Sequence, residues 1–328
     1  MSFMRALQCQ NFGRPPIWLM RQAGRYLPKY RAMRRGRSLL EMFHSPKTIV
    51  EVTELPIDVL NVDAAILFND ILTVFDGMSI RYDFQENIGP VVFDSPNAIN
   101  MRDPYDAYCY VIQAIQTLKK QLSIPLIGFA GGPFTIASYL IEKKSSQHLK
   151  KTKQLLYREP EIFLSLIEKI TEATIAYLNC QVEAGVDAIQ IFDSWAHVLA
   201  FSEFNHYCLK PMRDILNAID IPTILFCRGS SLFAPELATL HPAAISIDWN
   251  GSLPLIRKLI PQTVALQGNL DPMVLYGSQK EIASAIDRLL EGMKEDPGYI
   301  FNLGHGLLPD IPLENVKFMV DYVRLRSC

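Results

Sequence analysis

The chain has 328 residues, of which 49% are hydrophobic, and its 32 Lys and Arg nearly balance its 34 Asp and Glu. This length and apolar content can bury a large core, and a net charge of −2 excludes a general nucleic-acid-binding protein. The six cysteines form no CxxC pair and no Cys/His cluster, so we expect reduced, mostly structural thiols. The N-terminus shows no apolar leader, which favours a cytoplasmic protein.

Short runs of β-forming residues alternate along the chain with helical patterns. We expect strands at 16–20, 64–68, 125–130, 187–192, 222–227, 244–248, 263–267 and 299–303. We expect helices between them, among them 45–60, 104–121, 160–184, 202–218, 253–259, 280–294 and 313–325. Most of the strands are apolar on both faces, as in a sheet with helices outside and a barrel interior inside. The alternation predicts an α/β fold, a (β/α)8 TIM-type barrel in a single domain 1–328, with a doubly wound sheet as the alternative.

Two segments between these elements need their own interpretation. Residues 78–93 alternate in polarity around an Asn87-Ile88-Gly89 turn sequence, which predicts a β-hairpin inserted near the barrel mouth. Residues 121–141 carry no charge, but proline and glycine at 125, 128 and 131–133 would interrupt a membrane-spanning helix. We therefore expect a strand, a glycine loop and a helix there, and no membrane association.

Residues 15–37 are rich in arginine and contain no acidic residue, so we expect an anionic ligand at this segment. Arg21 and Arg25 directly follow the apolar run 17–20, at a strand end where α/β enzymes bind ligands. For Arg31, Arg34, Arg35 and Arg37, which lie on a helical-looking segment, the favoured interpretation from the residues alone is a solvated basic face.

In a barrel of this kind the chemistry lies at the C-terminal ends of the strands. The residues just after the predicted strands are Arg21, Arg25, Asp70, Tyr139, Ser194, Arg228, Asp248, Asn269 and His305. Asp70 is equally well explained as a helix N-cap, whereas His305 stands between two glycines that would let a ligand approach. Ser194 lacks the nucleophile motif of a hydrolase, so we expect it to form hydrogen bonds. No HExxH, Walker or GxGxxG motif is present, so we expect no metal, nucleotide or dinucleotide cofactor.

Several blocks of the sequence resemble the uroporphyrinogen decarboxylase family, in the family's order and over nearly the whole chain. These blocks are PPIWLMRQAGRYLPKYR, FNDIL, GGPFTIASYLIE, FDSWA, QGNLDP and NLGHGLLPD. The resemblance implies a (β/α)8 barrel, usually a homodimer, that acts in porphyrin and haem biosynthesis. Such an enzyme removes the carboxyl groups of the four acetate side chains of uroporphyrinogen III as CO2, giving coproporphyrinogen III without cofactor or metal.

The resemblance also implies roles for individual residues. The substrate-binding positions fall on Arg21, Gln22, Arg25, Arg34, Asp70, Tyr139, Phe192, Ser194 and His305, and the catalytic ones on Asp70, Arg21 and Arg25. Ionised Asp70 is expected to face the pyrrole N–H groups and to stabilise a cationic ring, while the arginines hold carboxylates. The chain departs from the family pattern at Asn69, where serine is usual, at Phe134, where tryptophan is common, at 143–146, where a glycine-rich run is usual, and at His197, where glycine is usual.

Two other functions remain open. A methyltransferase of the same superfamily would act on corrinoid-bound methyl groups and would need zinc, for which no convincing ligand spacing is present. A non-catalytic module that binds a polyanion such as RNA would explain the basic segment, but it would leave Asp70 unexplained.

Overall fold

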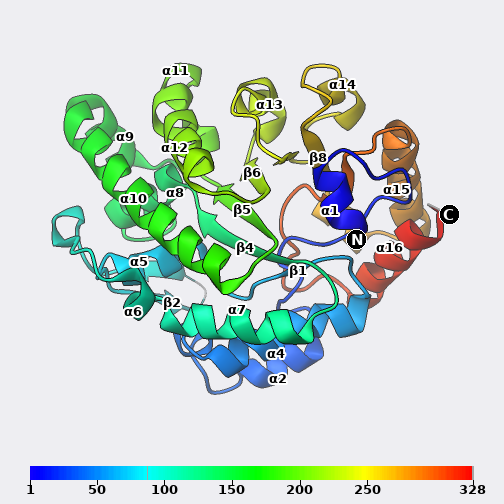
Figure 1. The fold of residues 1–328 in the computed structure, drawn as a ribbon, viewed down its shortest axis with the longest axis horizontal. Helices are drawn as coiled ribbons and strands as arrows, with labels where there is room; N and C mark the ends of the chain where they lie inside the picture. Colours follow the sequence, from blue (N-terminus) through cyan, green and yellow to red (C-terminus); the bar gives the residue numbers. More distant parts are fainter. Residues whose placement is uncertain (87, 327–328) are drawn as a thin grey trace.

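A curled parallel sheet forms the centre of the computed structural model, which describes residues 1–86 and 88–326 (Figure 1). Neighbouring strands lie in the order β1 (Ala65–Ile66), β4 (Leu126–Gly131), β5 (Ala188–Asp193), β6 (Thr223–Cys227), β7 (Ala244–Ser246), β8 (Ala265–Leu270) and β9 (Tyr299–Leu303). Every pair in this sheet is parallel. The prediction of an α/β fold with a TIM-type sheet is confirmed, although β1 and β7 are shorter than expected and β8 extends further.

The expected strand 16–20 is wrong as a regular strand, because this segment pairs with the sheet only through a single bridge between Ile17 and Phe301. Pro16 has no N–H to donate to a ladder, and the Ile17 N–H donates instead to Oδ2 of Asp63, at 2.8 Å. The carbonyl groups of the segment still reach both edges of the sheet. Phe301 N, on β9, donates to Pro16 O at 2.9 Å, and Asp63 N, just before β1, donates to Ile17 O at 2.8 Å. The segment therefore closes the sheet between β9 and β1 without being a strand itself.

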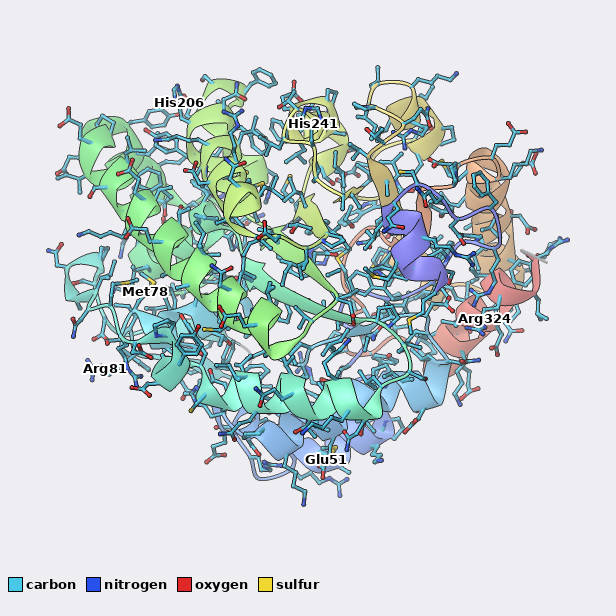
Figure 2. All side chains as sticks on the ribbon, in the orientation of Figure 1. Glu51, Met78, Arg81, His206, His241 and Arg324 are labelled. Atoms are coloured by element: carbon cyan, nitrogen blue, oxygen red, sulfur yellow. The ribbon has the colours of Figure 1, made fainter. Side chains whose placement is uncertain are left out.

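Helices surround the sheet and cover its outer face (Figure 1). The principal ones are α4 (Pro46–Leu60), α7 (Cys109–Gln121), α8 (Pro133–Glu142), α10 (Pro160–Ala184), α12 (Lys210–Ala218), α13 (Ser230–Ala238), α15 (Gln279–Met293) and α16 (Leu313–Arg326). Shorter ones are α1 (Ser2–Leu7), α2 (Pro28–Arg34), α3 (Leu39–Phe43), α5 (Val74–Gly77), α6 (Pro104–Ala107), α9 (Lys150–Arg158), α11 (Phe201–Phe204) and α14 (Leu253–Arg257). Charged side chains such as Glu51 on α4 and Arg81, just before Tyr82, lie on the outside of the molecule (Figure 2).

Two of the expected helices are each interrupted. The prediction 104–121 divides at Tyr108 into α6 and α7. The prediction 202–218 contains a π-helical turn, Asn205–Leu209, between α11 and α12. Periodicity could not locate these breaks, because the apolar stripe continues through both of them.

Local sequence fixes several helix ends. Ser278 accepts a hydrogen bond from Glu281 N while the Glu281 carboxylate accepts one from Ser278 N, a reciprocal cap that starts α15. Gly185 ends α10 at φ +112°, a conformation that side chains other than glycine rarely adopt. These ends set where each helix returns the chain to the sheet.

The predicted hairpin is present as β2 (Tyr82–Gln85) paired antiparallel with β3 (Gly89–Val92). Asn87 of its expected turn lies outside the described residues. Val92 N donates to Lys143 O at 2.7 Å, just past the end of α8, and Pro90 lines the central cavity. The hairpin thus lies at the barrel mouth, as expected.

Buried hydrophobic side chains form one continuous core cluster, which supports the proposal that residues 1–328 form a single domain. Across residues 1–86 and 88–326, none of the helices combines the length and apolar character that a membrane span requires. Cys9, Cys109, Cys180, Cys208 and Cys227 are all free thiols. Cys328, the sixth cysteine, lies outside the described residues.

Candidate active site

A cavity of about 270 Å³ opens at the C-terminal ends of the strands. Seven of the predicted substrate-binding residues line it: Arg21, Gln22, Asp70, Tyr139, Phe192, Ser194 and His305. They come from positions spread over nearly the whole sequence, and the parallel sheet brings them to one end of the barrel. The structure therefore assembles most of the predicted site in one place.

Arg25 and Arg34 do not line this cavity. Together with Arg31, Arg35 and Arg37 they line an open groove, which we call the arginine groove. The groove and the cavity are only a few residues apart in sequence, because Gln22 and Ala23 line the cavity and Arg25 lines the groove. The loop that begins at Arg21 therefore supplies arginines both to the cavity and to the groove, which Glu41 and Glu86 also line.

The backbone of this loop is held by Gln22, which is fully buried. Its Oε1 accepts a hydrogen bond from Leu19 N at 3.1 Å, and its Nε2 donates one to Ala64 O at 3.2 Å. Tyr26 donates its hydroxyl proton to Gln22 O. Because the amide is already occupied by these backbone groups, Gln22 contributes by positioning the loop that presents Arg21.

Arg21 has φ +60°, in the left-handed region that a residue other than glycine occupies only where its surroundings hold it. Its side chain lies against Gly306, where an added Cβ would be 2.6 Å from Cγ of Arg21 and would overlap its Cδ. Leu307 N also donates to Met20 O at 3.0 Å. The N-terminal arginine loop and the glycine-rich segment around His305 therefore fit each other closely.

Asp70 lies four residues after the end of β1, and its two carboxylate oxygens differ in what they contact. Its Oδ1 accepts a hydrogen bond from Leu72 N at 2.9 Å and so caps the short 3₁₀ helix Ile71–Thr73. Within the described part of the chain Oδ2 makes no hydrogen bond, which leaves it available to a ligand. Burial raises the pKa of Asp70 to about 6, against the lowering effects of the Leu72 N–H and of the positive charge of Arg21.

His305 and Tyr139 are both uncharged at neutral pH, and burial shifts the pKa of each further from neutrality. Burial and the positive charges of Arg21 and Arg228 lower the pKa of His305 to about 4. Burial raises the pKa of Tyr139 above its usual value. Both side chains can therefore form neutral hydrogen bonds to a ligand.

Three phenylalanines form an aromatic wall from the adjacent strands β4, β5 and β6. The ring centroids of Phe129 and Phe192 are 5.7 Å apart, and those of Phe192 and Phe226 are 5.9 Å apart. All three line the cavity. Only Phe192 was predicted, although the position of each ring near the end of its strand was a signal for the other two.

The remaining strand-end candidates mostly brace loops. Asp248 accepts hydrogen bonds from Gly229 N and Ser231 N, at 3.2 and 2.8 Å. Asn269 donates from Nδ2 to Asp248 O at 2.8 Å. Arg228 lines no part of the cavity, but its charge acts on His305.

Sequence reasoning missed the buried Asp193, one residue before Ser194. It accepts hydrogen bonds from both the backbone N–H and the hydroxyl of Thr135, and burial raises its pKa to about 6. The Thr135 Oγ1 in turn accepts a bond from Trp195 N at 2.9 Å. Asp193 therefore holds the loop that carries Ser194, and its place inside an apolar strand was the signal that could have identified it.

The site suits an apolar ring system that carries carboxylates. The aromatic wall can pack against the rings, the free oxygen of Asp70 can accept hydrogen bonds from them, and the arginines of the cavity and of the groove can bind the carboxylates. Among residues 1–86 and 88–326, no three His, Cys, Asp or Glu side chains are grouped so that they could hold a metal ion. The fold and the site thus define an α/β-barrel enzyme for an anionic, cyclic substrate.

A family model described as uroporphyrinogen decarboxylase (URO-D) matches residues 1–325. A relative of that name from Protochlamydia amoebophila is 46% identical, over 98% of this chain and 91% of the relative. Another from Trichlorobacter lovleyi is 41% identical, over 99% of this chain and 98% of the relative. The chain belongs to the uroporphyrinogen decarboxylase family.

Solved structures confirm the fold alone. A methyltransferase from Methanosarcina mazei superposes with a TM-score of 0.84 at 20% identity, over 100% of this chain and 98% of that one. A B12-independent methionine synthase from Shewanella sp. W3-18-1 gives a TM-score of 0.55 at 13% identity, over 84% and 87% of the two chains.

Proposed function

We propose that this chain is a uroporphyrinogen decarboxylase that converts uroporphyrinogen III to coproporphyrinogen III by releasing its four acetate carboxyl groups as CO2. The observation that carries the proposal is the free Oδ2 of Asp70 inside a cavity bounded by Arg21 and the aromatic wall. The pyrrole N–H groups of the substrate point toward the centre of its ring, so one carboxylate can accept hydrogen bonds from several of them. The Phe129, Phe192 and Phe226 rings offer an apolar surface to the macrocycle.

The chemistry follows from this arrangement. A proton adds to a ring carbon of the pyrrole that carries the reacting acetate, and the ring becomes a cation. The C–COO⁻ bond then breaks, its electron pair flows into the ring and CO2 leaves. Protonation of the resulting exocyclic carbon and loss of the ring proton give a methyl group. Each carboxylate is thus replaced by a proton, and one CO2 is released for each proton consumed. Asp70, ionised above a pH of about 6, stabilises the cationic stage electrostatically.

The other residues hold carboxylates in this proposal. Arg21 orients the reacting acetate from the cavity side, and Arg25 and Arg34 bind carboxylates that reach the arginine groove. Tyr139, Ser194 and neutral His305 contribute hydrogen bonds within the cavity. Phe192 packs against the ring.

We further propose that the protein is a homodimer. Exposed apolar side chains on α11, α13 and the segment after β7 support this proposal, since Phe201 is 57%, Leu232 71% and Trp249 37% exposed. Phe201 stacks with Phe233, next to Leu232, at 6.4 Å between ring centroids. Light scattering coupled to gel filtration tests the assembly. A cytoplasmic location stays a prediction from the sequence.

The decisive experiment is incubation of the purified protein with uroporphyrinogen III under reducing conditions, followed by chromatography. The proposal expects intermediates with seven, six and five carboxyl groups and then the four-carboxyl product. It also expects full activity in EDTA without added cofactor. Activity that is lost in EDTA and restored by zinc would favour the methyltransferase alternative, and salt-dependent RNA binding without decarboxylation would favour the polyanion-binding one.

A further inference from the structure

The imidazole ring of His197 is hydrogen-bonded to the backbone of Ser194. His197 follows Ser194 by three residues in the loop after β5 and is half-buried. Its Nδ1 lies 3.0 Å from Ser194 O. Because a carbonyl oxygen can only accept, Nδ1 carries a proton and donates it. The ring therefore closes the turn from which the Ser194 side chain reaches the cavity.

The same ring stacks on Trp195. The two ring centroids are 6.0 Å apart, and the ring planes differ by 26°. Trp195 in turn lies edge-on to Tyr139, with 6.3 Å between their centroids. Burial raises the pKa of Tyr139, and hydrogen bonds from the side chains of Trp195 and Ser145 oppose that rise. Since an indole can only donate, Trp195 presents its N–H to the Tyr139 hydroxyl, and His197 packs against the ring that does so.

The loop after β6 also contacts His197. An added Cβ at Gly229 would lie 3.3 Å from Cβ of His197, and Gly229 N is itself fixed by its 3.2 Å bond to Oδ2 of Asp248. Burial lowers the pKa of His197, and the positive charge of Arg228 adds to this, against the raising effect of the Ser194 carbonyl. The ring is therefore uncharged at pH 7.5, with its one N–H on Nδ1.

We propose that His197 is a positioning residue for the substrate carboxylates. Its Nδ1–H holds the turn that presents the Ser194 hydroxyl, and its ring, through Trp195, holds the Tyr139 hydroxyl. His197 does not line the cavity, so it acts only through these two residues, which do. The inference rests on the proposed function, in which Ser194 and Tyr139 form hydrogen bonds to carboxylates.

The loop has a second anchor that does not involve His197. Trp195 N donates to Thr135 Oγ1 at 2.9 Å, and Thr135 is bonded to the buried Asp193. A change at His197 should therefore leave the loop folded and alter only the aim of the two hydroxyl groups. Such a change weakens binding in the ground state and the transition state alike, so it should raise KM and leave kcat nearly unchanged.

Two substitutions separate the two contacts of His197. His197→Asn keeps an N–H donor one bond from Cγ, where Nδ1 stands, and removes the ring. His197→Phe keeps a ring to stack on Trp195 and removes the donor. Each should raise KM for uroporphyrinogen III by about 3–10-fold with kcat within about twofold, and His197→Ala, which loses both contacts, should raise it further.

The same two substitutions at His206 are the matched controls. His206 is an exposed histidine on the π-helical turn, with its ring 6.3 Å from that of Tyr207. His206→Asn and His206→Phe should leave KM unchanged. If the His197 variants lower Tm and also leave KM unchanged, His197 is a structural residue alone and the proposal is overturned.

Double-mutant cycles then test which hydroxyl each contact serves. In a Ser194→Ala background, His197→Phe should change KM by less than about twofold, whereas His197→Asn should keep its full effect. In a Tyr139→Phe background the two results should be exchanged. Effects that add in both backgrounds would overturn the positioning role, even if each single variant binds substrate more weakly.

A binding measurement separates this inference from the proposed function. Uroporphyrin, the oxidised macrocycle with the same carboxylates, is titrated by fluorescence, and its Kd should follow the same pattern across the variants. If the parent protein binds uroporphyrin but releases no CO2 from uroporphyrinogen III, the proposed function fails, and the cycles on Kd still test His197. If the parent decarboxylates and the cycles are additive, the inference alone fails. A parent that binds no uroporphyrin and releases no CO2 would refute both.

Discussion

Replacement of Asp70 by asparagine separates the charge of this residue from its shape. Asparagine keeps an oxygen that can accept the Leu72 N–H bond, so the cap of the 3₁₀ helix remains. The negative charge that faces the ring cation is lost. Because that cation exists chiefly near the transition state, kcat should fall by about 10²–10³-fold, with a smaller change in KM.

The structure also predicts that this inactive variant is more stable than the parent. Burial raises the pKa of Asp70 from 3.8 to about 6, so the ionised form is disfavoured in the folded protein. A difference of about 2 in pKa corresponds to about 3 kcal/mol, and partial exposure of the side chain reduces this to about 1–2 kcal/mol. Asp70→Asn should therefore raise Tm by a few degrees at pH 7.5.

The gain in stability should depend on pH in a definite direction. The native carboxyl contributes most to stability when protonated, and that contribution is lost as the pH rises from about 4 through about 6. The advantage of the asparagine variant should hence be full above pH 7 and should shrink as the pH falls toward 4. Melting curves across this range, recorded beside kcat, measure both effects.

Asp271→Asn is the matched control, because Asp271 caps the 3₁₀ helix Pro272–Tyr276 by accepting from Met273 N, also at 2.9 Å. It should change neither Tm nor kcat appreciably. Near-normal turnover by folded Asp70→Asn would refute the electrostatic role and leave Asp70 as a cap alone. A fall in Tm at pH 7.5 would refute the assigned cost of its buried charge.

Other substitutions test the arginines and their surroundings. Arg25→Ala should raise KM by about 10–100-fold, because a charge-assisted hydrogen bond of about 1.5–3 kcal/mol is lost; an unchanged KM with a collapsed kcat would instead place Arg25 in the chemistry. Gly306→Ala should lower kcat/KM nearly as much as Arg21→Ala, because the added methyl group occupies the place of the Arg21 side chain, whereas Gly13→Ala, with only one atom within 4 Å, should be neutral. His305 should show no titration by NMR between pH 5.5 and 8, since its pKa is lowered to about 4; a shift of its ring signals in that window would contradict the neutral imidazole.

The barrel could be predicted from the sequence because its evidence is local and repeated. Apolar runs separated by helical periods mark β4, β5, β6 and β9 closely. The segment 16–20 has the same apolar character, but its pairing is decided by Pro16 and by the distant Asp63. Such a tertiary contact leaves no periodic signal.

The candidate site divides in the same way. Asp70 and His305 stand out in the sequence because a polar residue ends an apolar run or lies between glycines. Asp193 and Phe226 carry weaker signals, an acid inside an apolar strand and a ring near a strand end, and only the fold shows that one holds Thr135 and the other lines the cavity. The sequence also predicted that Gln22 binds the substrate. The structure was needed to show that its amide already bonds backbone groups.

The closure of the sheet by residues 16–20 links assembly of the site to the formation of β9, the last strand of the sheet. Met20 N donates to Oδ1 of Asn302 at 3.1 Å, across 282 positions of sequence. Until β9 has formed, the Arg21 loop therefore lacks the bonds that Phe301, Asn302 and Leu307 make to it, although its bonds to Asp63 and Ala64 need only the segment before β1. The Arg21 side of the cavity is thus completed only when the last strand of the sheet is in place.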